Sequence, residues 1–119
     1  MQQSEVPSIK AIVDEKLHYE HTRVLAAQLI ANTVEVLEQY RLFTKDQNRD
    51  ITMDLMFSVC AVLDGSACPG TMNGEEIAPF VGFYLNHDTD KALVPENGSG
   101  MHAFIEELVD KHYLRGKGE

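Results

Sequence analysis

The chain has 119 residues, of which 44% are hydrophobic and 24% charged, and its formal net charge is -9 at pH 7. This length and composition predict one globular domain over residues 1–119 and disfavour general disorder. The negative charge disfavours binding to nucleic acid or to an anionic membrane, and the longest apolar run is far too short to span a bilayer.

The ends of the sequence are polar, and we expect residues 1–6 and 115–119 to be flexible. The first residues lack the basic start and apolar centre of a signal peptide, so a cytoplasmic location is expected. In that compartment Cys60 and Cys68 would both be reduced thiols. Cys60 lies in an apolar run and is expected in the core, whereas Cys68 is the more exposed candidate for a reactive thiol.

Residues 9–43 contain no proline or glycine and carry apolar residues at helical spacing. They predict a long N-terminal helix, or a helical hairpin that breaks near His21 and Thr22. A single helix of this length would extend roughly 50 Å at 1.5 Å per residue, beyond the diameter of a small domain. We therefore favour a long helix that packs partly against a second copy of the chain, with a kinked intramolecular bundle as the alternative.

The central segment is the most apolar, since only Asp54 and Ser58 are plainly polar between Met53 and Leu63. A helix that is apolar on nearly every side is expected to be surrounded by the rest of the protein. This pattern predicts a central buried helix over residues 51–63, after a polar connector and before a left-handed glycine at Gly65. Asp50 or Thr52 would cap its start.

Turn signals follow the central helix, and residues 77–85 could form either a helix or a strand. Pro79 and Gly82 disfavour the helix, and the aromatic residues around them favour a strand. We expect a short β pair within residues 77–94, with residues 92–94 as the second strand.

Residues 101–114 predict a C-terminal amphipathic helix capped by Ser99. Its apolar face would consist of Met101, Phe104, Ile105, Leu108 and His112. Together the elements predict a mostly α protein, with an α+β class left open.

The charge is concentrated between Asp50 and Asp110, where eleven acids stand against one base, Lys91. This imbalance favours a basic protein partner, although acidic surfaces also simply keep small proteins soluble. The leading hypothesis is a non-enzymatic interaction protein, such as an inhibitor, an immunity-type protein or an adaptor. The expected contact residues are Asp64, Glu75, Glu76, Asp88, Asp90 and Glu96.

A second hypothesis is a metal-binding or thiol-dependent small enzyme that uses Cys68 or a metal site. Asp14, His18 and His21 fall on one face of a helix, and this set suits zinc or another first-row divalent metal. The same face points away from the apolar stripe, so solvated polar side chains are the competing interpretation.

Two further patterns leave their function open. The residues from Asn86 to Asp90 have the alternating spacing that opens a calcium loop, but Lys91 replaces the required glycine, so an acidic turn is expected. The aromatic residues belong either to the core or, where exposed, to a partner-binding surface. They are Tyr40, Phe43, Phe57, Phe80, Phe83, Tyr84 and Phe104.

Overall fold

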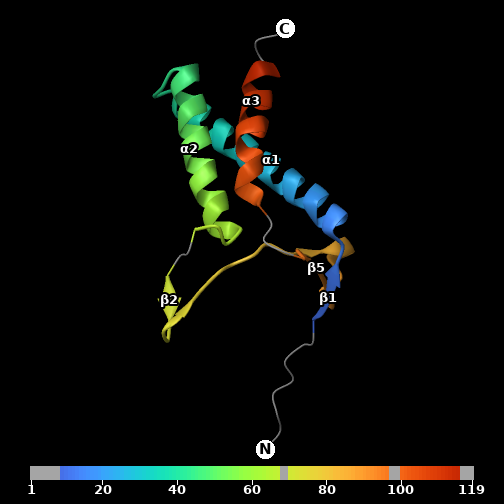
Figure 1. Ribbon diagram of the computed structural model, residues 1–119. Helices are drawn as coiled ribbons and strands as arrows, with labels where there is room; N and C mark the ends of the chain where they lie inside the picture. The colour runs from blue at the N-terminus through green and yellow to red at the C-terminus, as the bar shows by residue number, and fades with distance from the viewer. Residues whose placement is uncertain (1–8, 68–69, 97–99, 116–119) are drawn as a thin grey trace, which may run out of the picture.

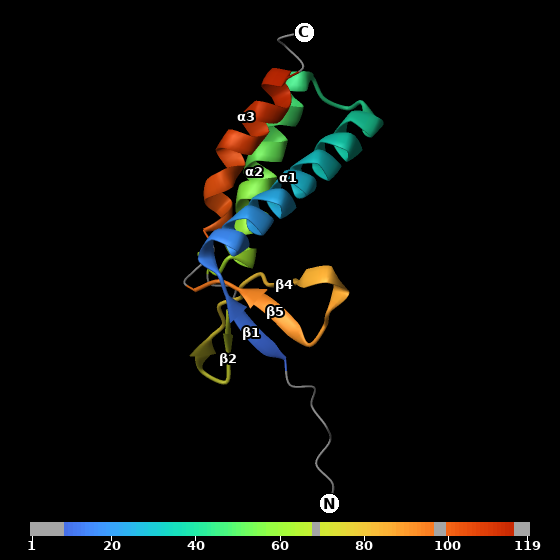
Figure 2. The ribbon, with the colours of Figure 1, turned by 90° about the vertical axis from the view of Figure 1, so that its right-hand side faces the viewer.

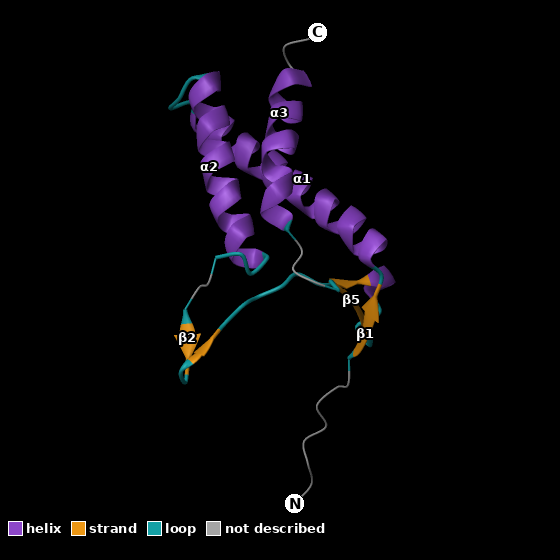
Figure 3. Ribbon diagram, in the orientation of Figure 1, coloured by secondary structure: helices purple, strands orange, loops and turns teal. Residues whose placement is uncertain are grey.

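The computed structural model describes residues 9–67, 70–96 and 100–115. Three helices pack together at one end of the molecule, and two small sheets lie at the other (Figures 1 and 3). In order these elements are β1 (Lys10–Val13), α1 (Glu15–Tyr40), α2 (Lys45–Leu63), β2 (Thr71–Met72), β3 (Glu75–Glu76), β4 (Phe83–Tyr84), the 3₁₀ turn η1 (Leu85–His87), β5 (Lys91–Val94), the 3₁₀ turn η2 (Met101–Phe104) and α3 (Ile105–Arg115). The predicted class, mostly α with some β, is confirmed. The predictions for residues 1–6, 68, 99 and 116–119 lie outside the described residues.

Helix α1 is continuous and does not break near His21 and Thr22. The Asp14 carboxylate caps its start by accepting a hydrogen bond from the Leu17 amide at 3.1 Å. Its 26 residues extend about 39 Å at 1.5 Å per residue. Every fourth residue along one stripe is buried: His18, Thr22, Ala26, Ile30 and Val34. Val24, Val36 and Tyr40 stay exposed, and packing of this helix against a second copy remains a prediction.

The residues before α1 correct the predicted helix, because Lys10–Val13 form a strand. This strand, β1, pairs in parallel with β5, in the register Ile12 to Leu93 and Val13 to Val94. The β-branched Ile12 and Val13 suit a strand, and the cap at Asp14 sets the point where the helix begins.

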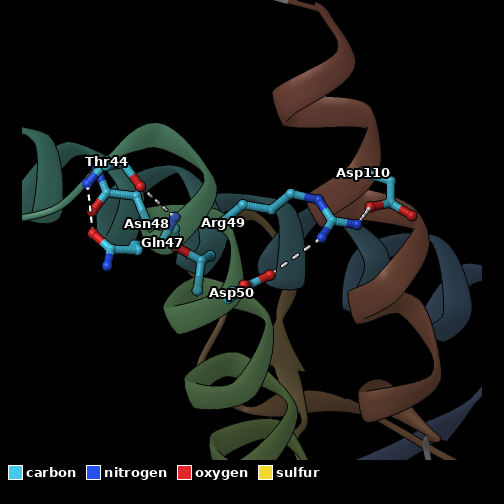
Figure 4. A network of polar contacts seen from close by, with 7 residues as sticks. Thr44, Gln47, Asn48, Arg49, Asp50 and Asp110 are labelled. Carbon is cyan, nitrogen blue, oxygen red and sulfur yellow. Dashed lines mark hydrogen bonds and ion pairs between the residues drawn. The ribbon is translucent and has the colours of Figure 1, made fainter.

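Helix α2 begins at Lys45, earlier than the predicted Ile51. A capping box fixes this start: the Thr44 hydroxyl accepts from the Gln47 amide at 3.1 Å, and the Gln47 side chain accepts from the Thr44 amide at 2.9 Å (Figure 4). The helix ends before Gly65, whose φ of 80° confirms the left-handed position.

The expectation that α2 is surrounded on all sides is wrong for the single chain. Its buried residues form one stripe of Asn48, Thr52, Met56 and Cys60. On its other sides Leu55, Phe57 and Val62 are 47%, 50% and 42% exposed. The apolar composition of the segment therefore does not mean that every face of the helix is buried.

The helical core joins stripes from α1 and α2 to η2 and α3. Its buried hydrophobic residues are Ala26, Ile30, Val34, Met56, Cys60, Met101, Phe104, Ile105, Val109 and Tyr113. The predicted apolar face of the last helix is shifted, since Val109 and Tyr113 are buried whereas His112 is exposed. The 3₁₀ turn η2 (Met101–Phe104) takes the place of the first turn of the predicted helix, and α3 begins only at Ile105.

Two ion pairs link α3 to the other helices. Arg23 of α1 contacts Glu107 at 2.5 Å, and Arg49 of α2 contacts Asp110 (Figure 4). Arg49 also lies 3.4 Å from Asp50. Because these pairs are partly or largely exposed, solvent screens them and each contributes little to stability, so the buried stripes dominate helix packing.

The larger sheet has the order β1-β5-β4, and it lies next to the start of α1 (Figure 2). β4 pairs antiparallel with β5, with Phe83 opposite Leu93 and Tyr84 opposite Ala92. This confirms the predicted β pair, although only two residues of the 77–85 segment belong to the strand. The smaller sheet, β2 with β3, is a hairpin whose turn has positive φ at Asn73 and Gly74.

Candidate functional site

One face of the larger sheet packs against α1. Leu93 on this face is fully buried. The Phe83 ring lies 5.4 Å from the His18 ring and 5.5 Å from the His21 ring, centroid to centroid. His18 is itself buried and lies within 2.7 Å of the Val81 carbonyl oxygen through Nε2. The start of α1 thus covers this inner face.

Side chains alternate along each strand, so Ala11, Tyr84, Ala92 and Val94 lie on the opposite face of the sheet, and this face is apolar. We call it the open sheet face and define it as Ile9, Ala11, Phe80, Tyr84, Ala92 and Val94. These residues line a hollow of about 420 Å³. A second hollow of about 470 Å³ shares Ala11, Phe80 and Val94 with it, and continues towards Gly65 and Pro79.

The open sheet face keeps large apolar side chains in contact with solvent. Ile9, Phe80 and Tyr84 are 49%, 59% and 52% exposed. Parallel strand pairs, such as β1 with β5, are ordinarily covered on both faces. Among the described residues, α1 covers only one face of this pair, so the sheet presents an apolar surface typical of an interaction site.

Five of the six predicted acidic contact residues are exposed, two of them on the separate β2–β3 hairpin and three beside the larger sheet. Glu75 and Glu76 are exposed on β3, Asp88 and Asp90 are exposed in the turn before β5, and Glu96 is exposed after it. The Asp88 carboxylate accepts from the Asp90 amide at 3.0 Å, which fits the expected acidic turn.

Asp64 is different, because it is buried rather than part of the acidic surface. Its side chain is fully shielded from solvent. The carboxylate accepts hydrogen bonds from the Ser66 amide at 2.9 Å and from the His102 amide at 3.0 Å, and lies 2.6 Å from Nδ1 of the His102 ring. Burial raises the pKa of Asp64, but hydrogen bonds from His102 and Ser66 outweigh it and hold that pKa below its ordinary value. The carboxylate is therefore ionised at neutral pH.

His102 lies at the edge of a pocket of about 570 Å³ between α2 and η2. Met53 and Phe57 form its apolar wall, and Asp54, Ser58 and Glu106 bring polar groups. The Phe57 ring meets the His102 ring edge-on, with centroids 5.3 Å apart. The Asp64–His102 pair was not predicted from the sequence.

The predicted metal ligands are each engaged in hydrogen bonds of the fold. Asp14 caps α1, and Nδ1 of His21 lies 2.9 Å from the Leu17 carbonyl oxygen. Both ring nitrogens of His18 have partners, Nε2 the Val81 oxygen and Nδ1 the Thr22 hydroxyl at 3.2 Å. Within the described residues, no group of three or more His, Cys, Asp and Glu side chains could hold a metal ion. These contacts favour a structural role for the three residues.

Of the two cysteines, Cys60 is fully buried and free. Burial, with a smaller contribution from the Asp64 charge, raises the pKa of its thiol to about 11. The expectation of a buried core thiol is confirmed, and the thiolate needed for reactivity is scarce at neutral pH.

The aromatic residues divide between core and surface. Phe104 is buried at 6% exposure, and Phe83 is half-buried against α1. The exposed members are Tyr40, Phe43, Phe57, Phe80 and Tyr84. Phe80 and Tyr84 lie on the open sheet face and Phe57 lies at the pocket, so three of these five exposed aromatic residues border hollows.

No protein-family model, no curated protein and no solved structure matches this chain. None of the helices in the described residues is both long and apolar enough to cross a membrane.

Proposed function

We propose that the protein is a non-enzymatic interaction protein that binds a basic protein partner through the open sheet face and the carboxylates around it. The observation that carries the proposal is the parallel pair β1–β5, whose Ala11, Ala92 and Val94 lie on the face that α1 does not cover. A partner would supply the second layer that such strands ordinarily have.

The exposed side chains of this face provide an apolar anchor. Burying a large apolar side chain stabilises an association by about 1.5–3 kcal/mol before the entropic cost of binding. Phe80 and Tyr84 are about half exposed, so each offers a substantial part of this gain. Aromatic residues of this kind carry much of the binding energy in protein interfaces.

Charge selects the class of partner. The larger sheet and the segments beside it, residues 9–13 and 80–96, carry three acids, Asp88, Asp90 and Glu96, against two bases, Lys10 and Lys91, and the whole chain carries a net charge of -9. Two copies of the chain would bring like charges together, whereas a basic protein would gain from electrostatic steering. A basic partner with an apolar contact patch therefore fits this face better than a second copy does.

The test is affinity capture from the native cell lysate with four baits: wild type, Phe80→Ala, Tyr84→Ala and Val24→Ala. Val24 is 69% exposed on α1 and serves as the matched control, since it borders neither hollow. We expect a basic protein that wild type and Val24→Ala retain equally at low salt and release at high salt. Phe80→Ala and Tyr84→Ala should each reduce its recovery about tenfold, the equivalent of 1.4 kcal/mol.

Two results would contradict the proposal. One is a captured protein whose recovery is the same with all four baits. The other is a partner held equally at low and high salt, because steering between exposed charges is screened by ions.

A further inference from the structure

The pocket between α2 and η2 lies apart from the open sheet face, and its chemistry does not depend on the function proposed for that face. We propose that it is a binding site for an organic cation with N–H donors, an alkylguanidinium or a primary alkylammonium. The argument begins with the Asp64–His102 pair.

The Asp64 carboxylate fixes the tautomer of His102. An ionised carboxylate can only accept hydrogen bonds, so Nδ1, 2.6 Å from Asp64 Oδ2, carries the ring proton. In the neutral ring this leaves Nε2 with a free lone pair, on the ring edge opposite Asp64. Within the described part of the chain, Nε2 has no hydrogen-bond partner. The ring is 30% exposed, and it lines the pocket.

The other polar groups of the pocket are also acceptors. Asp54 and Glu106 bring exposed carboxylates, and the Ser58 hydroxyl can accept as well as donate. None of the residues that line the pocket is a lysine or arginine. A ligand that satisfies this set must be rich in N–H donors and positively charged.

The apolar wall adds a second element of recognition. Phe57 is 50% exposed at the pocket, and Met53 lies beside it. A guanidinium or ammonium group near an aromatic face gains from the negative charge of the ring quadrupole, and the alkyl chain can contact the methionine. A volume of about 570 Å³ holds such a group together with several methylenes.

The site is therefore selective for cations with a short alkyl chain. The same chemistry occurs in a free small cation and in an arginine or lysine side chain of a protein. Two probes distinguish these sources: butylguanidinium, and a blocked Gly-Arg-Gly peptide.

Binding of each probe to the full chain can be followed by NMR, through the ¹³C and ¹⁵N signals of the His102 and Phe57 rings. We expect saturable shifts of both rings with butylguanidinium and none with pentanol, a neutral analogue of similar length. The variants Asp54→Asn and Glu106→Gln, which alter exposed side chains, should each weaken binding about tenfold, and Glu35→Gln on α1 should leave it unchanged.

His102→Gln provides an independent test of the imidazole, and its folding is checked by urea unfolding. Loss of binding in a folded His102→Gln protein supports the proposal. Equal affinity of the peptide and butylguanidinium would identify the source as a protein side chain, and exclusion of the peptide would identify a free cation. The proposal is overturned by absent shifts with both probes, by equal binding of pentanol, or by equal affinity in Asp54→Asn, Glu106→Gln and Glu35→Gln.

Discussion

Replacing Asp64 with alanine should destabilise the protein more than replacing any surface carboxylate with alanine does. The carboxylate accepts from the Ser66 and His102 amides and contacts the His102 ring, and its side chain is fully buried. Hydrogen bonds to a charged group contribute about 1.5–3 kcal/mol each and are not additive, and the alanine variant loses all three of those that Asp64 accepts. We therefore expect Asp64→Ala to lower the free energy of unfolding by about 3–5 kcal/mol at pH 7. Asp64→Asn, which keeps one acceptor oxygen, should lose about 1–3 kcal/mol.

The effect should depend on pH, because hydrogen bonds hold the pKa of Asp64 below its ordinary value in the folded state. In the unfolded chain that pKa is about 3.9. Between the two pKa values the unfolded state binds more protons, so stability rises with pH. The contribution of Asp64 to the free energy of unfolding is complete above about pH 3.9 and is lost as the pH falls through its pKa in the folded state.

The assay is urea unfolding, followed by far-ultraviolet circular dichroism, of wild type, Asp64→Ala and the exposed control Asp54→Ala. The control should change stability by no more than about 0.5 kcal/mol. The difference between wild type and Asp64→Ala should narrow as the pH is lowered below about 4. The reasoning is refuted if Asp64→Ala resembles the control at pH 7, or if its deficit is the same at low pH.

Three further predictions concern the backbone, the thiol and the core. Gly65→Ala should destabilise the protein more than Gly74→Ala in urea unfolding. Both positions have φ near +80°, but a Cβ at Gly65 would lie 2.8 Å from the Pro79 carbonyl oxygen, whereas one at Gly74 would meet open space. Equal losses of stability would show that the contact with Pro79 does not matter. Cys60, with a pKa of about 11, should react with iodoacetamide at neutral pH only after the protein unfolds. Mass spectrometry with and without urea measures this labelling, and rapid labelling of the folded chain would contradict the burial of Cys60. Ile30→Ala should lower the free energy of unfolding by about 2–5 kcal/mol in the same assay, because Ile30 is 1% exposed and its truncation leaves a cavity. A decrease below about 1 kcal/mol would be inconsistent with a tightly packed core.

Local signals explain why much of the fold could be predicted from the sequence. A long stretch without proline or glycine specifies α1, and turn residues separate the later elements. Phe83 and Tyr84 suit a strand through their own side chains, and their partner lies a short turn away. The capping box of Thr44 and Gln47 is also a local signal, and it indicates that α2 begins at Lys45.

Non-local contacts explain what could not be predicted. β1 is a strand because it pairs with β5, far away in the sequence, and the apolar spacing of Ile9, Val13 and Leu17 equally fits a helix. The exposure of Leu55 and Phe57 on α2 depends on how the other helices pack, which periodicity does not report.

The candidate sites follow the same division. The excess of acids was visible in composition, and exposed carboxylates such as Glu75 and Asp88 do lie at the surface. Asp64 could not be distinguished from them by sequence, since its partner His102 lies 38 positions away and is brought to it by the packing of η2 on the end of α2. Conversely, His18 and His21 share a helix face as expected, but Phe83 and Val81 occupy the space beside them.

The central claim, that the open sheet face binds a basic protein, is tested most directly by amide hydrogen exchange of the protein with and without its purified partner. The account predicts that the partner slows exchange in residues 9–13, 80–84 and 92–94, and that this protection disappears at high salt and in Tyr84→Ala. Protection confined to α1 or α2, with unchanged exchange in these three segments, would contradict it.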